Sequence, residues 1–334
     1  MSKLPDKAIL PLLIAGSLAV CAVSMFTGAT SLNIKALIGT ANNIDSMIFW
    51  QIRVPRVCLA FLSGSGLALS GMVFQALFRN PLATPFTMGV SSGAALGASV
   101  CLRLGVIFTF CGISSVSVCA FTGALLSIFL VYGLVRAAGI FSTVAMLLAG
   151  VAVSLTFSSI ILFFQYISDF AQSYKIVRWL MGGVEVFGYE SVFHVFPFVM
   201  CGAVIVWFYL NELNVMATGD DVALSRGVNV RNTRKILFFG TSLVTGGVVS
   251  VCGPIGFIGM MIPHICRLII GPDHRKLAPA VFLSGGSFLV FCDALSRILI
   301  APAEMPVGII TALLGGPFFL WLFLKGAAKE EVCF

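Results

Sequence analysis

The chain has 334 residues, of which 59% are hydrophobic and only 10% are charged. Soluble globular domains carry about a quarter charged residues, so this composition excludes an ordinary soluble protein. The net charge of +7 does not indicate a nucleic-acid partner, because the basic residues are scattered near the ends of apolar stretches and form no cluster. The composition therefore predicts a protein embedded in a lipid bilayer.

Ten apolar stretches follow one another along the chain, and about 20 helical residues are enough to cross the hydrocarbon core of a bilayer. The stretches are continuous and do not alternate, which favours helices over barrel strands. We expect an all-α, polytopic membrane protein with about ten transmembrane helices and short connections, in one transmembrane domain over residues 1–334. The expected spans are 8–28, 57–78, 86–102, 106–135, 143–166, 191–210, 236–252, 254–270, 277–299 and 305–324.

The basic residues also predict the orientation of the spans. With both termini in the cytoplasm, 13 of the 20 Lys and Arg residues lie inside, as the positive-inside rule prefers. The first apolar stretch is longer than the usual core of a signal peptide, so we expect a retained helix there. Small residues such as Gly64, Gly71 and Gly93 predict close packing between helices.

The apolar stretches contain no visible source of energy. Seven of the ten lack Asp, Glu, Lys, Arg and His, whereas ion-coupled carriers place such groups or broken polar helices at mid-membrane. The sequence also lacks G-x-x-x-x-G-K-[ST], the motif that binds ATP phosphates. The ten cysteines are spread singly, so no metal site is expected. The pattern predicts a conduit that binds no cofactor and depends on another polypeptide for its energy.

A sharp turn is predicted between the second and third stretches, where residues 79–85 read RNPLATP. Two prolines four residues apart deny the backbone a continuous helix. Asn80 is expected to end the preceding helix, because Asn tolerates the left-handed conformation found at helix ends. The turn is either a simple tight loop or a functional constriction.

The longest expected cytoplasmic segment lies between the sixth and seventh stretches, at about 211–235. Thr218 and Asp221 have the spacing of a capping box, and Gly227 is a natural helix stop. These signals predict one short helix at about 219–226 outside the lipid. The spacing leaves open whether this helix is a solvated surface element or a docking element.

Charged residues also gather near the outer end of the ninth stretch. Asp293 and Arg297 are four residues apart, a spacing that allows an ion pair on one helix face. Glu304 follows in the short connection to the last stretch.

These segments together resemble the membrane subunits of bacterial ABC importers for iron-siderophores, haem and cobalamin, often called the FecCD type. The matching runs extend from about residue 50 to 324: RVPR at 53–56, GMVFQ at 71–75, RNPLATP at 79–85, GVSSGAA at 89–95, LLAGV at 147–151, RWLMG at 178–182, GDDVA at 219–223, RGV at 226–228, GPIGFIG at 253–259, PHICR at 263–267, DALSR at 293–297, EMPVG at 304–308 and GGPFF at 315–319.

The resemblance implies a set of partners in the bacterial cytoplasmic (inner) membrane. Two permease copies, most simply a homodimer, would surround a central pathway, with two cytoplasmic ATP-binding subunits and an extracytoplasmic substrate-binding protein. ATP and Mg²⁺ would be bound by the ATPase subunits, so this chain would not itself be an enzyme.

The resemblance also implies three groups of site residues. The ATPase-docking residues would be Thr218, Gly219, Asp220, Asp221, Ala223, Arg226 and Gly227, with the choice between Asp220 and Asp221 left open. Exposed arginines at Arg53, Arg56 and Arg297 would meet acidic residues of the binding protein. A cytoplasmic gate would consist of Asn80 and Leu82, with Ser142 and Thr143 as a second layer.

The substrate is not encoded in an obvious motif. An iron(III)-siderophore is the first choice, haem and cobalamin are the alternatives, and a small oxyanion is less favoured. A remote alternative is an intramembrane hydrolase, since residues 89–93 fit G-x-S-x-G and His264 could serve as a base. A carrier that works without ATP is the other remote alternative.

Overall fold

The computed structural model describes residues 6–28, 43–110, 112–139 and 143–327, and it confirms an all-α membrane protein. Within these residues, seven helices are long and apolar enough to cross a membrane, and three shorter apolar helices complete the ten expected spans. The elements are α1 (Asp6–Phe26), α2 (Asn43–Ile48), η2 (Phe49–Arg53), α3 (Val54–Phe78), α4 (Val90–Leu104), β1 (Thr109–Phe110), β2 (Ile113–Ser114), α5 (Ser115–Ala137), α6 (Thr143–Tyr166), α7 (Phe170–Leu180), α8 (Glu190–Phe208), α9 (Leu210–Thr218), α10 (Asp220–Ser225), α11 (Val230–Cys252), α12 (Ile258–Ile270), α13 (His274–Ile298) and α14 (Val307–Ala327).

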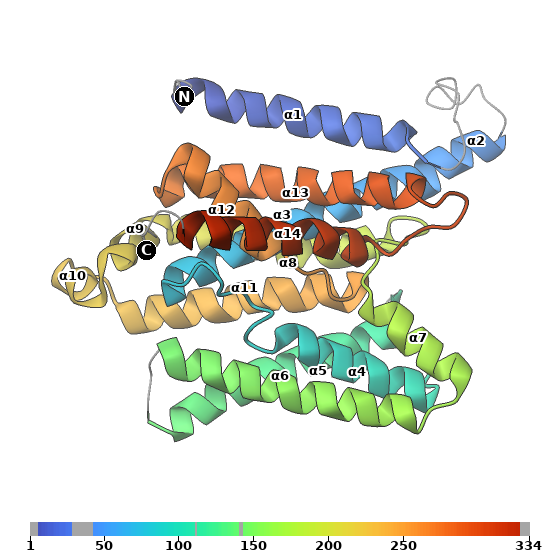
Figure 1. The fold of residues 1–334 in the computed structure, drawn as a ribbon, viewed down its shortest axis with the longest axis horizontal. Helices are drawn as coiled ribbons and strands as arrows, with labels where there is room; N and C mark the ends of the chain where they lie inside the picture. Colours follow the sequence, from blue (N-terminus) through green and yellow to red (C-terminus); the bar gives the residue numbers. More distant parts are fainter. Residues whose placement is uncertain (1–5, 29–42, 111, 140–142, 328–334) are drawn as a thin grey trace.

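The spans lie roughly side by side, with their axes along the long dimension of the molecule (Figure 1). One end carries α9 and α10, together with the start of α1 and the end of α14. The opposite end carries α2, α7 and the connection between α13 and α14. We call these the α10 end and the α7 end. The sequence predicts that the α10 end faces the cytoplasm.

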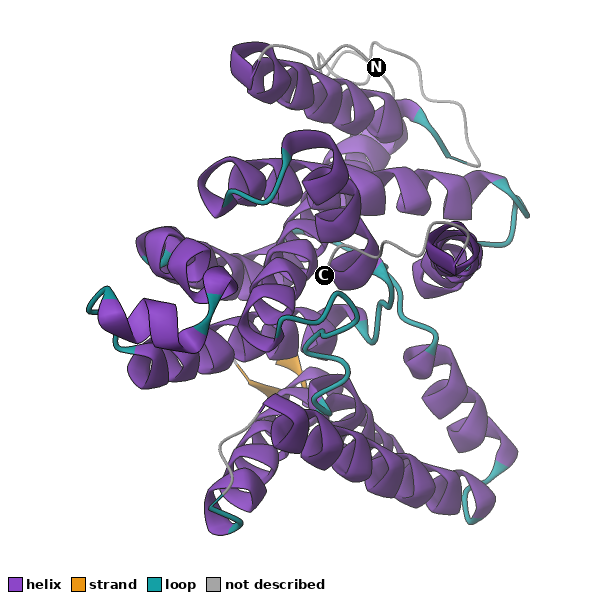
Figure 2. Cartoon of the chain, turned by 60° about the vertical axis from the view of Figure 1, so that its left-hand side comes forward, coloured by secondary structure: helices purple, strands orange, loops and turns teal. Residues whose placement is uncertain are grey.

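Helix α3 is the centre of the bundle and is mostly buried, whereas α1 is mostly exposed along its length. Helix α3 packs against α13, α12, α8 and α11. Helices α4, α5 and α6 form a second group, which contacts α11. Figure 2 views the bundle with the α10 end brought forward and shows a single short hairpin, β1–β2, among the helices of the described residues.

The predicted packing of small residues is confirmed at the helix contacts. A Cβ on Gly71 would lie 1.8 Å from the carbonyl oxygen of Gly259, and one on Gly64 would lie 2.3 Å from that of Gly285. Gly93 has the same relation to Gly123, with a distance of 2.4 Å. The backbones of α3, α12, α13, α4 and α5 therefore approach as closely as they do because no side chain stands between them.

Three of the expected spans begin later than the hydropathy indicated. The span expected from residue 106 is α5, which starts only at Ser115, after the β1–β2 hairpin. Helices α4 and α12 start at residues 90 and 258, and turns occupy the residues before them. Gly89 and Phe257, which precede the two helices, have φ angles of +83° and +67°. Left-handed backbone at these points ends the turns and starts the helices. Irregular backbone at membrane depth is tolerated where protein surrounds it.

Candidate functional sites at the two ends of the bundle

The segment between α8 and α11 folds as two short helices at the α10 end, where a single helix was expected. Helix α9 ends at Thr218, and α10 begins directly after Gly219, whose φ angle is +142°. The expected capping box is wrong, because the Thr218 hydroxyl donates to the carbonyl of Val215 within α9. The N-terminus of α10 has no side-chain cap. The expected stop is confirmed, since Gly227 has a φ angle of +80° and follows α10.

Helix α10 presents apolar side chains to the outside. Val222 is 40% exposed and Leu224 is 59% exposed, while Ala223 is fully buried against the rest of the chain. Asp221 and Arg226 are also exposed. A six-residue helix outside the spans with exposed apolar side chains is suited to contact another protein. The docking role of residues 218–227 stays a prediction.

An ion-pair network fixes α10 to the neighbouring spans. The carboxylate of Asp220 pairs with the guanidinium of Arg79, which directly follows α3. The same carboxylate lies 2.9 Å from Nη2 of Arg234, in the first turns of α11. Nη2 of Arg79 also donates to the carbonyl of Met216 in α9 at 3.1 Å. Sequence reasoning missed this network, because Arg79 and Asp220 are 141 residues apart.

The other side of α9 is held by the start of α13. The Asn214 side chain donates to Asp273 Oδ1 at 2.7 Å and accepts from the backbone amide of His274 at 2.8 Å. Nε of Arg275 donates to Asn211 Oδ1 at 2.6 Å. The Asp273 carboxylate also accepts from the backbone amide of Arg275. This bond is the chief cause that lowers the pKa of Asp273, and the bond from Asn214 is the next. Polar contacts thus join helices α9 and α10 to three spans, α3, α11 and α13.

The turn at residues 79–89 contains the expected gate residues Asn80 and Leu82. Arg79, and not Asn80 as expected, adopts the left-handed conformation that ends α3. The Asn80 carboxamide instead accepts a hydrogen bond from the amide of Leu82 at 2.9 Å, which tightens the turn. Leu82 is 53% exposed. An exposed leucine on a rigid turn is suited to close a pathway against an identical residue.

The expected second gate layer consists of Ser142 and Thr143. Ser142 lies outside the described residues, and Thr143 begins α6, with its side chain outside the description.

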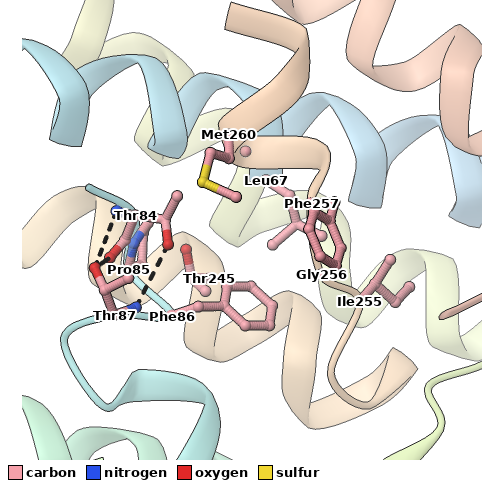
Figure 3. Close-up of a pocket in the computed structure, with 11 residues that line it drawn as sticks. Leu67, Thr84, Pro85, Phe86, Thr87, Thr245, Ile255, Gly256, Phe257 and Met260 are labelled. Atoms are coloured by element: carbon pink, nitrogen blue, oxygen red, sulfur yellow. Dashed lines mark hydrogen bonds between the residues drawn. The ribbon is translucent and has the colours of Figure 1, made fainter. Parts of the chain in front are cut away.

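A cavity of about 170 Å³ separates the 79–89 turn from the turn before α12 (Figure 3). Its lining is mostly apolar, and the Thr84 and Thr87 hydroxyls in its wall are engaged with each other's backbone. Drug-sized ligands occupy pockets of about 300–1,000 Å³, so this space is too small for a metal chelate. The cavity is room between two turns that face each other inside the bundle. It is lined by Leu67, Thr84, Pro85, Phe86, Thr87, Thr245, Ile255, Gly256, Phe257, Gly259 and Met260.

A cluster of charges is buried at the α7 end. Nε of Arg56 lies 2.9 Å from Asp293 Oδ1, and its Nη1 lies 2.7 Å from Glu304 Oε2. The expected ion pair between Asp293 and Arg297 is confirmed, with a distance of 3.2 Å. Asp293 is fully buried, while the Glu304 side chain is 39% exposed. The cluster joins α3, α13 and the connection to α14.

Two arginines of this end hold the C-terminus of α1. Arg297 donates through Nη1 to the carbonyl of Thr27 at 2.7 Å and through Nη2 to the hydroxyl of Ser24, also at 2.7 Å. Nη1 of Arg53 donates to the carbonyl of Met25 at 3.2 Å. The last carbonyls of a helix lack partners within it, and α1 has no basic residue in its last turn. The arginines therefore supply donors that α1 lacks.

The expectation that Arg53, Arg56 and Arg297 are exposed is wrong. Their exposed fractions are 5%, 6% and 3%. Carbonyl and carboxylate groups of this chain bind all three guanidinium groups. The exposed basic side chains among the described residues of this end lie on α7, at Lys175 and Arg178. Arg178 pairs with Glu185 on the loop that follows. Whether the three buried arginines take part in docking stays a prediction.

Helix α7 was not expected from the sequence, although a signal for it exists. The Asp169 carboxylate accepts from the amide of Gln172 at 2.7 Å, which caps the first turn of α7. Asp and Gln three residues apart resemble a capping box. The helix was missed because the spans were predicted from continuous apolar stretches, and α7 is not one of them.

The geometry expected of a hydrolase is not present in the described residues. A G-x-S-x-G elbow joins a strand to a helix, whereas a turn without any strand precedes Gly89. Ser91 is buried within the first turn of α4. Among the described residues, no three His, Cys, Asp or Glu side chains gather in an arrangement that could hold a metal ion.

Comparison with known proteins connects these features to one family. The FecCD transport family matches residues 12–325. The cobalamin import system permease protein BtuC of Halobacterium salinarum is 40% identical over 276 residues, which are 83% of this chain and 73% of that protein. The hemin transport system permease protein HmuU of Yersinia pestis is 39% identical over 305 residues, 89% of this chain and 90% of that protein.

A solved structure agrees with this match. It is described as an inward-facing conformation of a metal-chelate type ABC transporter, and it superposes with a TM-score of 0.86 at 30% identity. The match covers 96% of this chain and 99% of that one. A family match over nearly the whole chain, relatives near 40% identity and a shared ten-span fold agree with one another. The chain is a member of the FecCD transport family.

Proposed function

We propose that the chain is the membrane permease subunit of a binding-protein-dependent ABC importer for a metal chelate or a related large cofactor. The main observation in support is helix α10, which has exposed apolar side chains. An ion pair joins this helix directly to the turn that contains Leu82. Such an element can receive force from a cytoplasmic ATPase and deliver it to the pathway. The sequence contains no phosphate-binding loop of its own, so ATP hydrolysis belongs to a separate subunit.

We propose further that two copies of the chain surround the pathway. The cavity between the two inner turns holds about 170 Å³, too little for a chelate. A hollow of about 410 Å³ opens on the surface beside α14, lined by apolar residues such as Met181, Pro254 and Ala312. Leu82 and the outer face of α14 are exposed in the single chain. A pathway shared between two such surfaces accounts for both features.

The cargo is proposed as an iron(III)-siderophore, with haem and cobalamin as the alternatives. Names of relatives support the class, since two relatives at about 40% identity are named as permeases for cobalamin and hemin. The cargo is selected largely by the binding protein that delivers it. The outer docking surface is proposed to include α7, where Lys175 and Arg178 are exposed.

The function is tested by reconstitution. Proteoliposomes contain the chain with the ATPase and binding protein encoded beside its gene, and they are supplied with a ferric hydroxamate siderophore, haemin or cyanocobalamin. Uptake is expected for one ligand, only with ATP and only with both partners. Uptake by the chain alone would refute the proposal, because it would show a carrier that needs no ATPase.

The outer docking surface is tested separately by binding. The variant Lys175→Glu is expected to weaken association with the binding protein several-fold at low ionic strength, with the difference shrinking at high salt. The matched control is Lys235→Glu, because residue 235 lies at the α10 end. Equal affinities for the two variants would exclude α7 from the contact.

A further inference from the structure

The two adjacent acids of α10 occupy different environments. Asp220 pairs with Arg79 and Arg234, whereas the ion pairs of the described residues do not use the exposed Asp221. Residues three apart share a helix face, so Asp220 lies on the same side as the fully buried Ala223. Asp221 lies with Leu224 on the exposed side. Asp221 is therefore the acid of α10 that is free for a partner, whereas two arginines engage the carboxylate of Asp220.

The partner of Asp220 is part of the turn that carries Leu82. Arg79 is the residue at which α3 ends, and its left-handed backbone begins the 79–89 turn. Two residues separate it from Leu82, and the hydrogen bond between the Asn80 side chain and the Leu82 amide holds this stretch in a tight turn. A displacement of the Arg79 guanidinium therefore moves the start of the turn.

The contacts of Arg79 reach both docking helices. Its guanidinium binds the Asp220 carboxylate at the start of α10 and the Met216 carbonyl in α9. Arg234 binds the same carboxylate but lies only 14 residues farther along the chain, in the helix that follows α10. Arg79 is thus the long-range connection, and Arg234 fixes the orientation of the carboxylate.

Resting on the function proposed above, we propose that Asp220 is a positioning residue that transmits movement of α10 to the 79–89 turn through Arg79, while Asp221 belongs to the surface that meets the ATPase. Exposed ion pairs add little to stability, because solvent screens them. The Arg79 side chain is 46% exposed to solvent. The network therefore sets geometry and contributes little to holding the fold together, which makes the two roles separable by mutation.

The test measures the accessibility of the turn in the complete complex. The chain with Leu82→Cys is assembled with its ATPase in lipid nanodiscs and treated with a polar maleimide, with and without ATP and Mg²⁺. Mass spectrometry of the peptide containing residue 82 separates its labelling from that of the native cysteines. In this background the labelling rate is expected to change by about fivefold or more when ATP is added.

The variants Arg79→Gln and Asp220→Asn are each expected to abolish this ATP-dependent change, and Arg79→Lys is expected to restore part of it because it keeps the positive charge. The matched control is Arg136→Gln, which removes an exposed arginine from the last turn of α5, and it should keep the full change. Asp221→Asn should require more ATPase for assembly yet keep the change once the complex is saturated.

The outcomes separate this inference from the proposed function. If Leu82→Cys responds to ATP and Arg79→Gln responds equally, the inference is wrong and the permease function stands. If Arg79→Gln and Arg136→Gln lose the response alike, the loss reflects charge in general and the inference is also wrong. If the ATPase never assembles with the chain bearing Leu82→Cys alone, both the inference and the proposed function are overturned.

Discussion

The two ends of the bundle use the same residue types in opposite ways. At the α7 end, Asp293 is fully buried between Arg56 and Arg297. At the α10 end, Asp220 lies between Arg79 and Arg234, and its side chain is 41% exposed. Removing one partner from a buried pair leaves an uncompensated charge, whereas exposed pairs are screened by solvent. One aspartate with two arginines therefore stabilises the fold at the α7 end, whereas the same arrangement at the α10 end adds little stability and can change its geometry at low cost.

The largest expected effect comes from Asp293→Ala. The variant leaves the buried guanidinium of Arg297 without its carboxylate and Arg56 with only Glu304, so the free energy of unfolding should fall by about 3–5 kcal/mol. Thermal unfolding of the purified chain in detergent measures the loss. Asp220→Ala is the matched control, with an expected cost of about 0–1 kcal/mol. Equal losses at the two aspartates would remove the distinction between the ends.

The next effect concerns the attachment of α1. Arg297→Ala removes the donors that bind the carbonyl of Thr27 and the hydroxyl of Ser24. Hydrogen bonds from charged donors contribute about 1.5–3 kcal/mol each, so amides at the C-terminal end of α1 should exchange hydrogen much faster. Hydrogen exchange followed by mass spectrometry measures this. Gly16→Ala is the control, because a Cβ there meets nothing within 4 Å; unchanged exchange in Arg297→Ala would contradict the anchoring role.

A smaller effect on stability but a clear effect on assembly is expected for Leu224→Asp. The side chain is 59% exposed on α10, so its replacement should leave the unfolding temperature unchanged. Association with the ATPase should weaken about tenfold or more, because an apolar contact would be replaced by a desolvated charge. Affinity is measured by titrating labelled ATPase into nanodiscs.

The control for this variant comes from the opposite end of the bundle. Ile107 is 95% exposed in the connection after α4, so Ile107→Asp should not change the affinity. A similar loss for both variants would point to a general effect of the added charge.

The smallest effect depends on pH and concerns Asp273. Its carboxylate accepts from the Arg275 amide at 3.1 Å and from Asn214, and these bonds lower its pKa. A lowered pKa means that the stabilisation is present above the usual value of 3.8 and is lost as the pH falls through the lowered pKa. Asp273→Ala should cost about 1 kcal/mol at neutral pH, as other N-cap losses do. Unfolding curves of parent and variant should converge in acid; a constant difference at all pH values would contradict the assignment.

The spans and their order were predictable because each depends on local composition. Continuous apolar runs between glycine, proline and charged residues indicated the ten helices, and the glycines of α3 indicated its close contacts. The late starts of α4 and α12 were missed because Phe257 and the residues after Thr84 are as apolar as a helix. Hydropathy does not distinguish a turn that protein surrounds from a helix in lipid.

The arrangement of the charges was not predictable in the same way. Arg56 and Asp293 are 237 residues apart, and Arg79 and Asp220 are 141 apart. Only the i and i+4 pair of Asp293 and Arg297 had a visible spacing. The resemblance placed Arg53, Arg56 and Arg297 on the surface, and the sequence does not show which carbonyls and carboxylates of the chain lie near them. The capping motif at Thr218 failed since the residues before it continue as α9.

The attachment of α1 has a consequence for how the protein is made. The first span reaches the membrane early in synthesis. The guanidinium that binds the end of this span belongs to Arg297, which lies 270 positions after Thr27. Helix α1 packs chiefly against α13 and makes few contacts with other elements, so until α13 is inserted the first helix remains loosely associated in lipid. A ribosome stalled before residue 297 should therefore yield a nascent chain whose first helix is still separate from the others. Release of the stall should let α1 pack against α13.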